Sequence, residues 1–229
     1  TKKITRFYPK SINKECTTNI INRLLKHSDG NVYAFCNRSV FKCSMNQTVE
    51  TVFPDIAIPS PTYSVAQAPD KDIYIGTESN GLYIYSENWK LKKHVPIDGI
   101  IATILPDNNG DIWLGLDETG ICLFNKNKQT FTWLHKDNTN LNNNSIRTFV
   151  SYGDSSILVG TFRGLNILNK KELTITPANI NIAGKGGLSH YSIHSMLIDK
   201  DQTLWIGTYS AGVNYHSPCL LYTSPSPRD

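Results

Sequence analysis

This sequence lacks the features that mark several large classes of protein. No apolar run approaches the roughly 18 residues that a membrane-spanning helix requires. Strong charge of one sign is also missing, since 23 Lys and Arg stand against 19 Asp and Glu, and this balance argues against a nucleic-acid surface. The motifs GxSxG and HExxH and a phosphate-binding glycine loop are absent. We therefore predict no catalytic residue and no cofactor.

Cysteine is scarce, and its spacing gives no CxxC pair. Before the C-terminal stretch, the sequence contains Cys16, Cys36, Cys43 and Cys122. Cys36 and Cys43 flank a predicted hairpin turn, so they could lie across from one another and form a disulfide. The alternative, which we favour, is that both are small buried hydrophobic residues.

Two other patterns resemble metal sites only superficially. His190 and His194 are four residues apart in a predicted strand, which separates them by about 13 Å. The segment from Asp107 to Asp111 lacks the distal bidentate glutamate of a calcium loop, so we interpret it as a plain turn. No metal site is predicted.

What the sequence does contain is a repeated pair of strands. In the stretch from Asp107 to Asn125, DNNGDIWLGLDETGICLFN, turn-forming residues lead into a short apolar strand, a tight connection, a glycine and a second strand. Similar stretches begin near residues 28, 70, 153 and 199. A further apolar segment precedes each copy, and another follows the first four. Four short strands in repeats of about 40 to 47 residues indicate the blades of a β-propeller.

Three sets of positions recur between the repeats. Trp113 and Trp205, with Tyr33 and Tyr74, share one position on the second strand, where large flat side chains would fill the space between neighbouring blades. The second strand ends at a glycine where we expect a tight turn, at Gly76, Gly115, Gly160 and Gly207. The third strand opens at a glycine where we expect a positive φ or a close backbone approach, at Gly81, Gly120, Gly164 and Gly212.

We therefore predict an all-β fold: a β-propeller fragment of about five four-stranded blades, from a ring of about seven. The blade-like repeats lie near residues 20–54, 63–97, 100–135, 145–177 and 191–217, within a partial propeller spanning residues 1–218. Thr1 to Tyr8 looks like the last strand of a preceding blade. Because an open arc leaves unpaired edges, we expect the protein to continue on both sides.

The C-terminal stretch from Cys219 to Asp229, CLLYTSPSPRD, breaks the repeat pattern. It resembles the translation of a sequencing adapter, so residues 219–229 are expected to be non-native, with native sequence ending near Pro218. The alternative is a genuine tail rich in Pro and Ser. We leave this stretch out of the fold prediction.

The repeats carry a family resemblance. The run D-x-x-G-x-[IL]-W-[IL]-G-[TL], followed by a glycine and a short strand, resembles the regulator-propeller repeat of hybrid two-component sensors from gut Bacteroidetes. DNNGDIWLGLDETGICLFN and DKDQTLWIGTYSAGVNYHS match best, and the resemblance covers roughly residues 20 to 217. Asn144 to Arg147 and Tyr191 to His194 are similar to the start of the family's first strand. Phe35 in place of glycine and Leu158 in place of an aromatic depart from the pattern.

The resemblance implies a function outside this segment as well as within it. Such propellers form the periplasmic sensing region of an inner-membrane sensor histidine kinase, which would act as a homodimer. Their ligands are typically oligosaccharides, and their output is transcription of glycan-use genes through a kinase that this segment does not contain. The segment itself would be neither an enzyme nor a contact for nucleic acid.

Candidate ligand contacts lie in the connections between second and third strands, which should emerge on one face close to the central channel. Aromatic rings there would stack on sugars and polar groups would meet hydroxyls. The candidates are Arg38, Glu78, Asp117, Glu118, Phe162, Arg163 and Tyr209. The alternative is that they are ordinary solvated turn residues. Trp89 and Trp133 are secondary candidates, and the segments 137–144 and 183–188 are longer inserts that would contact a partner or be mobile.

Two other functions stay open at this stage. The propeller could be a protein-interaction scaffold without a small ligand. It could also be a glycosidase or lyase, which would need paired carboxylates at one mouth. Glu78 and Asp117 are the nearest approach to such a pair, although no motif joins them.

Overall fold

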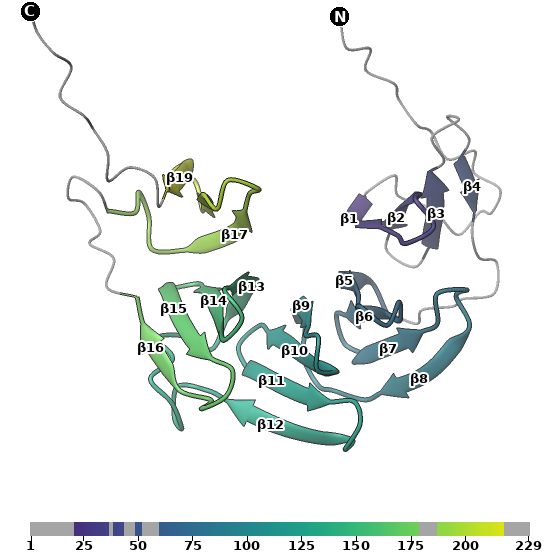
Figure 1. The fold of residues 1–229 in the computed structure, drawn as a ribbon, viewed down its shortest axis with the longest axis horizontal. Coiled ribbons are helices and arrows are strands. Elements are labelled where there is room, and N and C mark those ends of the chain that lie inside the picture. Colours follow the sequence, from purple (N-terminus) through teal and green to yellow (C-terminus); the bar gives the residue numbers. More distant parts are fainter. Residues whose placement is uncertain (1–20, 37–38, 44–48, 52–59, 179–186, 218–229) are drawn as a thin grey trace, which may run out of the picture. The chain divides into compact units, whose positions relative to one another are not determined.

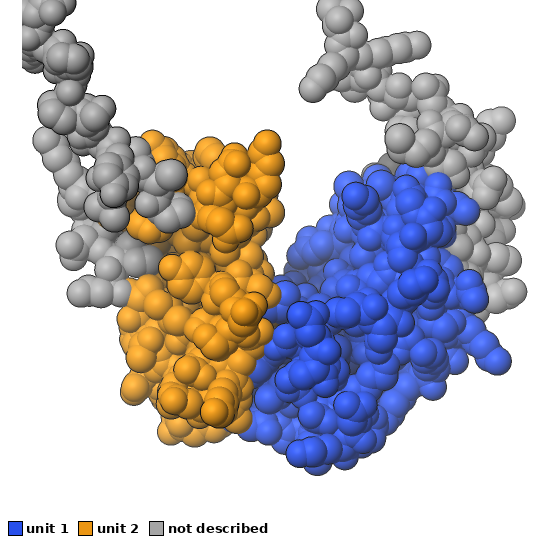
Figure 2. Space-filling model, viewed as in Figure 1, with its two compact units in different colours: residues 1–133 blue, residues 134–229 orange. Residues whose placement is uncertain are grey.

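The computed structural model describes residues 21–36, 39–43, 49–51, 60–178 and 187–217, drawn in colour in Figure 1. These residues form β-strands joined by turns and loops, and the described ranges contain no helix, hence none that could cross a membrane. The chain divides into two compact units, residues 1–133 and residues 134–229 (Figure 2). Arg38, the predicted strand from Thr1 to Tyr8 and the tail from Cys219 to Asp229 lie outside the described residues.

The first unit contains three four-stranded antiparallel sheets, each with its strands in sequence order. Sheet 1 consists of β1 (Ile21–Lys26), β2 (Val32–Cys36), β3 (Ser39–Cys43) and β4 (Val49–Thr51). Sheet 2 consists of β5 (Thr62–Gln67), β6 (Ile73–Thr77), β7 (Leu82–Tyr85) and β8 (Leu91–Val95). Sheet 3 consists of β9 (Ile101–Pro106), β10 (Asp111–Leu116), β11 (Gly120–Asn125) and β12 (Thr130–Leu134), whose last residue already belongs to the second unit.

The second unit contains two sheets of the same kind. Sheet 4 consists of β13 (Ile146–Tyr152), β14 (Ser156–Thr161), β15 (Gly164–Asn169) and β16 (Ile175–Pro177). Sheet 5 consists of β17 (Ile193–Ile198), β18 (Leu204–Thr208) and β19 (Val213–His216), so it has three strands among the described residues. The all-β prediction is confirmed, and four of the five repeats show the complete four-stranded sheet.

Neighbouring sheets pack through the alternating side chains of their second strands. Successive strand residues point to opposite faces. Tyr33 of β2 therefore joins a core cluster with Ile73 and Ile75 of sheet 2. Tyr74 of β6 joins the next cluster with Ile112 and Leu114 of sheet 3. For these tyrosines, the predicted role of filling the space between sheets is confirmed.

The same position behaves differently in the two sheets of the second unit. Leu158 of β14 packs in one cluster with Leu204 and Ile206 of sheet 5, although it is aliphatic rather than aromatic. Trp205 of β18 is 41% exposed, because no further sheet covers that face in the described part of the chain. An aromatic ring is therefore one way of filling this position, and its burial depends on a following sheet.

The glycines that end the second strand have a different role from the one expected. Each is the second-last residue of its strand and its φ angle is not positive, so the chain turns just after the glycine rather than at it. A Cβ built on Gly76 would lie 2.6 Å from Ile101 Cγ2 of sheet 3, and one built on Gly160 would lie 2.6 Å from Ile193 Cγ2 of sheet 5. These glycines let the first strand of the next sheet come close. In sheet 1, where Phe35 replaces the glycine, β2 makes no comparable approach to β5.

The second set of glycines does adopt positive φ, as expected. The φ angles are 72° at Gly81, 98° at Gly120, 125° at Gly164 and 82° at Gly212. Other residues are strained in this region, so glycine opens the third strand in all four repeats.

The possible disulfide is ruled out by the strand register. Cys36 pairs with Ser39, whereas Cys43 pairs with Val32 at the other end of the same hairpin. Neither residue forms a disulfide, and Cys36 packs in a small apolar cluster with Ala34 and Phe41. Burial raises the pKa of the Cys43 thiol, which fits its interpretation as a small hydrophobic residue.

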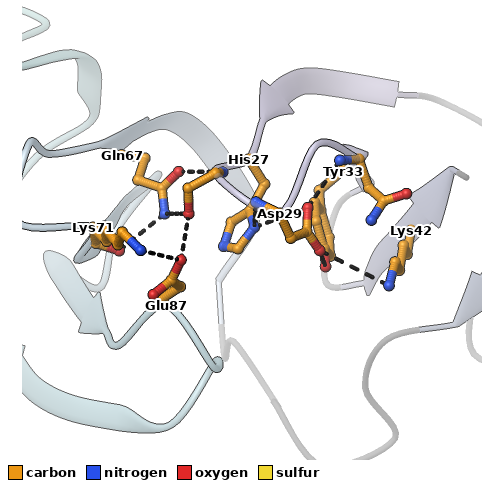
Figure 3. Close-up of polar contacts among 9 residues, drawn as sticks. His27, Asp29, Tyr33, Lys42, Gln67, Lys71 and Glu87 are labelled. Atoms are coloured by element: carbon orange, nitrogen blue, oxygen red, sulfur yellow. Dashed lines mark hydrogen bonds and ion pairs between the residues drawn. The ribbon is translucent and has the colours of Figure 1, made fainter.

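Polar contacts join sheets 1 and 2 at the turn between β1 and β2 (Figure 3). The backbone N–H of Ser28 donates to Gln67 Oε1 at 2.8 Å, and its hydroxyl donates to Glu87 Oε1 at 2.7 Å. Lys71 Nζ lies 3.1 Å from the same Glu87 oxygen. His27, which is buried, stacks on Trp89 with ring centroids 5.7 Å apart. These contacts fix the turn of sheet 1 against sheet 2.

Asp29 accepts the hydrogen bonds on the other side of that turn. It accepts hydrogen bonds from the Asn31 N–H at 2.9 Å and the Tyr33 hydroxyl at 2.8 Å, and Lys42 Nζ lies 3.8 Å away. Partial burial would raise the pKa of the Asp29 carboxyl, but the hydrogen bonds from Asn31, Tyr33 and His27 outweigh it and lower the pKa well below 3.8. The folded protein therefore binds fewer protons at Asp29 than the unfolded chain does.

This pKa shift predicts a loss of stability in acid. The contribution of Asp29 should be fully present above its unfolded pKa, near 3.8, and should vanish as pH falls through the lower folded value. In Asp29→Asn one of the two acceptor oxygens remains, the other becomes an amide donor, and the charge is gone. Denaturant titrations from about pH 5 to pH 2 should show the stability difference between wild type and variant shrinking with acid. A pH-independent difference would contradict the assignment.

A second ionic contact joins sheets 2 and 3. Lys126 Nζ lies 2.6 Å from Asp70 Oδ2 and 2.5 Å from Asp72 Oδ2, and Lys92 also pairs with Asp72. The Asp72 side chain is 3% exposed, so two lysines offset the cost of burying its charge. Burial opposes the shift at Asp70, but its bond with Lys126 lowers the pKa of that carboxyl.

Candidate functional site

Four of the predicted ligand contacts occupy the same corner of four different sheets. In each, the backbone N–H of the first residue after the second strand donates to a carbonyl oxygen just before the first strand. The pairs are Glu78 with Pro61, Asp117 with Ile100, Phe162 with Ser145 and Tyr209 with Ser192, all at 3.0 Å. The backbone is therefore constant at this corner while the side chain changes from carboxylate to aromatic.

The connection after the corner is closed by a threonine in three of the repeats. The hydroxyl of Thr77 donates to the Gly81 carbonyl at 2.8 Å, and that of Thr208 donates to the Gly212 carbonyl at 3.0 Å. Thr161 Oγ1 lies 2.9 Å from the Gly164 carbonyl oxygen. Each of these bonds spans the connection and restrains it.

In the first unit the corners present carboxylates. Glu78 is exposed and Asp117 is half-buried, and Glu118, the next residue, is exposed with φ 66°. The loop that carries Glu78 is held by Asn80, whose Nδ2 donates to the Tyr83 hydroxyl at 2.8 Å and whose carbonyl oxygen lies 2.7 Å from His94 Nε2. Burial raises the pKa of the Tyr83 hydroxyl. The convergence of Arg38 with these residues stays a prediction.

In the second unit the corners present aromatic rings. Phe162 is 44% exposed and Tyr209 is 62% exposed. Arg163 follows Phe162 and is exposed, with its backbone N–H donating to the Thr161 hydroxyl at 3.1 Å. The Arg147 guanidinium lies 5.8 Å from the centre of the Phe162 ring, within the range of a cation–π contact.

Two neighbours of these corners were not among the predicted contacts. Arg147 and Tyr191 lie on either side of a Ser-Ile pair at the start of the first strand, in sheets 4 and 5 respectively. Tyr191 is 43% exposed and stacks on His190 with ring centroids 4.3 Å apart. The repeated Ser-Ile at 145–146 and 192–193 was the available signal, because in both repeats it marks the start of the strand next to the corner.

The Asn-rich segment before β13 is an ordered support rather than a mobile insert. Asn142 Oδ1 accepts from Asn166 Nδ2 at 2.8 Å and lies 2.8 Å from Thr161 Oγ1. Asn142 N–H donates back to Asn166 Oδ1 at 3.2 Å. Leu141 beside it is buried. The segment therefore holds the corner of sheet 4 in place through these contacts.

The secondary candidates have other roles or positions. Trp89 is 8% exposed and packs against Tyr33, with ring centroids 4.8 Å apart, so it belongs to the core between sheets 1 and 2. Trp133 is 36% exposed on the outermost strand of sheet 3. Among the described residues, no three His, Cys, Asp or Glu side chains gather as a metal ion would need.

Comparison with known proteins gives a family match in the fifth repeat. Residues 187–210 match the family described as two component regulator propeller. This segment contains the start of the first strand, the D-x-x-x-x-L-W-I-G run and the corner residue Tyr209. The resemblance to the regulator-propeller repeat is confirmed there. Among curated protein sequences, none is detectably related to this chain.

Solved structures share the fold over most of the chain. The extracellular domain assigned to the hybrid two component system BT3049 of B. thetaiotaomicron has a TM-score of 0.70 at 23% identity, over 91% of this chain and 28% of its own. The extracellular domain assigned to the one component system BT4673 of that organism has a TM-score of 0.71 at 19% identity, over 89% of this chain and 27% of its own. The computationally designed Ika8 protein has a TM-score of 0.60 at 12% identity, over 85% of this chain and 57% of its own.

These matches confirm the β-propeller fold, and the chain spans little more than a quarter of the two Bacteroides domains. Both domains are extracellular by description, which agrees with an extracytoplasmic location for a propeller of this type. Neither they nor the family match correspond to a kinase or another catalytic domain, in agreement with the expectation that this segment is not an enzyme.

Proposed function

We propose that this chain is part of the periplasmic sensing propeller of a two-component sensor, and that it binds an oligosaccharide. One observation supports this most directly: four sheets repeat one hydrogen-bonded corner, and the exposed side chain on it differs in each. A constant scaffold with variable exposed residues is the arrangement that recognition surfaces use. The exposed rings of Phe162 and Tyr209 suit sugar stacking, and Glu78 and Asp117 suit hydroxyl groups.

Signalling would follow from a change in state rather than from chemistry at the propeller. A ligand shifts an equilibrium only as far as it binds one state better than the other. In this proposal the parent sensor is a homodimer, the bound oligosaccharide biases one of its two arrangements, and a kinase elsewhere in the parent converts that bias into transcription.

The test is a calorimetric titration of the chain with a panel of oligosaccharides from dietary and host glycans. We expect saturable heat from at least one of them, and chromatography of the mixture should return that oligosaccharide intact. Cleaved sugar would instead establish a propeller glycosidase or lyase. If no sugar binds, the sensor proposal fails and the interaction scaffold replaces it.

A further inference from the structure

The corner of sheet 4 carries the guanidinium of Arg163, which has no hydrogen-bond or ion-pair partner among the described residues. Arg163 is exposed on a connection of only two residues between β14 and β15. Its backbone is fixed by the bond from its N–H to Thr161 Oγ1 at 3.1 Å, and Thr161 is fully buried. The guanidinium therefore extends from a rigid base beside the exposed ring of Phe162.

Both corners of the second unit rest on equivalent hydrogen-bond networks, part-buried in sheet 4 and exposed in sheet 5. In sheet 4, Asn142 bonds to Asn166, which is fully buried. In sheet 5, Ser189 takes the place of Asn142: its N–H donates to Asn214 Oδ1 at 3.0 Å, and its hydroxyl lies 3.1 Å from Thr208 Oγ1. Such support reduces the entropy lost when a ligand is bound.

The two corners belong to neighbouring sheets that touch at this end. Gly160, two residues before Phe162, lies against Ile193 of β17. Ile193 in turn pairs with Thr208, the residue before Tyr209. The rings of Phe162 and Tyr209 thus rise from adjacent sheets at the same end of their strands.

The balance of charge in the second unit differs between the two ends of its strands. The described acidic residues Asp154, Glu172, Asp199 and Asp201 lie in the turns at the end away from the corners, where Lys170, Lys171 and Lys200 only partly offset them. At the corner end the segment before β13 carries Asp137, which lies 3.6 Å from His135 Nδ1. The corners themselves carry Arg163 and no carboxylate. This end favours a ligand of negative charge.

We infer that the corners of sheets 4 and 5 form a binding site for an anionic saccharide, with Phe162 and Tyr209 stacking on sugar rings and Arg163 binding the acidic group. The inference rests on the proposed function and specifies its ligand class. A guanidinium binds carboxylate and sulfate alike through two parallel N–H bonds, so the shared chemistry is a planar or tetrahedral oxyanion on a sugar. Aromatic faces accept the sugar ring whether or not it is charged.

The test compares three saccharides with the full chain by calorimetry. They are an oligogalacturonide, its methyl ester, which keeps the ring and loses the charge, and a sulfated disaccharide. Wild type should bind an anionic sugar at least about tenfold more tightly than the methyl ester. Arg163→Gln should remove that preference and leave the affinity for the methyl ester unchanged. Phe162→Ala and Tyr209→Ala should weaken both forms.

The matched control is Lys171→Gln, which removes an exposed positive charge from the turn between β15 and β16 at the other end of sheet 4, and it should change none of these affinities. Far-UV circular dichroism and the denaturation midpoint establish that each variant folds. Equal binding of acid and ester by wild type would overturn the inference while leaving the sensor proposal intact. An anion preference that survives Arg163→Gln would also overturn it. If neither these sugars nor the wider panel bind, both proposals fail together.

Discussion

Replacing Trp113 with alanine should lower the free energy of unfolding by about 3–5 kcal/mol, the cost of deleting a large buried aromatic side chain. Trp113 is 1% exposed at the centre of β10, where it pairs with Leu105 on one side and Leu123 on the other. The neighbouring strands fix its backbone, so the surroundings can collapse only partly into the space it leaves. Urea denaturation followed by far-UV circular dichroism measures the loss, since fluorescence would change with the substitution itself.

Trp205 is the matched control for that result. It holds the equivalent position on β18, with Leu197 and Tyr215 as its partners in register, but it is 41% exposed. Trp205→Ala should cost less than about 1 kcal/mol in this chain. Equal losses at the two positions would show that the tryptophan stabilises its own sheet. A large difference would show that most of the stabilisation comes from burying the ring outside its own sheet.

Replacing Gly76 with alanine should destabilise the protein by about 1–3 kcal/mol, the usual cost of overpacking a core. Strand propensity alone predicts the opposite sign, since glycine in a strand interior costs about 0.5–1 kcal/mol relative to alanine. The new methyl group would lie 2.4 Å from Ser64 Oγ and 2.6 Å from Ile101 Cγ2. Both neighbours are buried, and Ile101 belongs to the next sheet, so the sheets would have to separate.

Gly207→Ala tests the same repeat position where the neighbour can move. A Cβ there would meet Ser195 Oγ at 2.5 Å, and every other atom lies beyond 3.4 Å. Ser195 is exposed, and rotation of its hydroxyl relieves the contact. We expect Gly207→Ala to be neutral or slightly stabilising by the same denaturation measurement. Destabilisation equal to that of Gly76→Ala would mean that the glycine serves its own sheet.

The repeat could be predicted from the sequence alone, because its turns, strands and glycines are local signals that recur in a fixed order. The aromatic position was also readable, since Tyr33 and Tyr74 sit at one offset from the turn and pack between sheets as expected. What could not be read was the role of Gly76 and Gly160. Each glycine faces an isoleucine of the following repeat, Ile101 for Gly76 and Ile193 for Gly160, and no local sequence pattern indicates that contact.

Long-range polar contacts were missed for the same reason. By composition, the Asn-rich loop looks like an insert. In the structure Asn142 bonds to Asn166, so the loop supports the corner of sheet 4. Cys36 and Cys43 show the converse. Their spacing across a turn suggests a possible disulfide, but the strand register separates them.

The candidate site was predicted in part. Glu78, Asp117, Phe162 and Tyr209 each follow the second strand of their repeat, which the sequence pattern indicates, and in the structure all four make the same backbone bond. Their binding of a ligand stays a prediction. Arg147 was overlooked because it lies on the first strand, and only the fold brings it to the Phe162 ring.

The most direct test of ligand recognition at the corners is hydrogen–deuterium exchange of the full chain, with and without an oligosaccharide that binds in the titration. Added protection should appear at Phe162 and Arg163 and from Tyr209 to Gly212. The turns at Asp154 and Asp201, at the other end of the same strands, should exchange at unchanged rates. Protection at those turns, with none at the corners, would contradict the account of this propeller as a scaffold that recognises its ligand through the connections after its second strands.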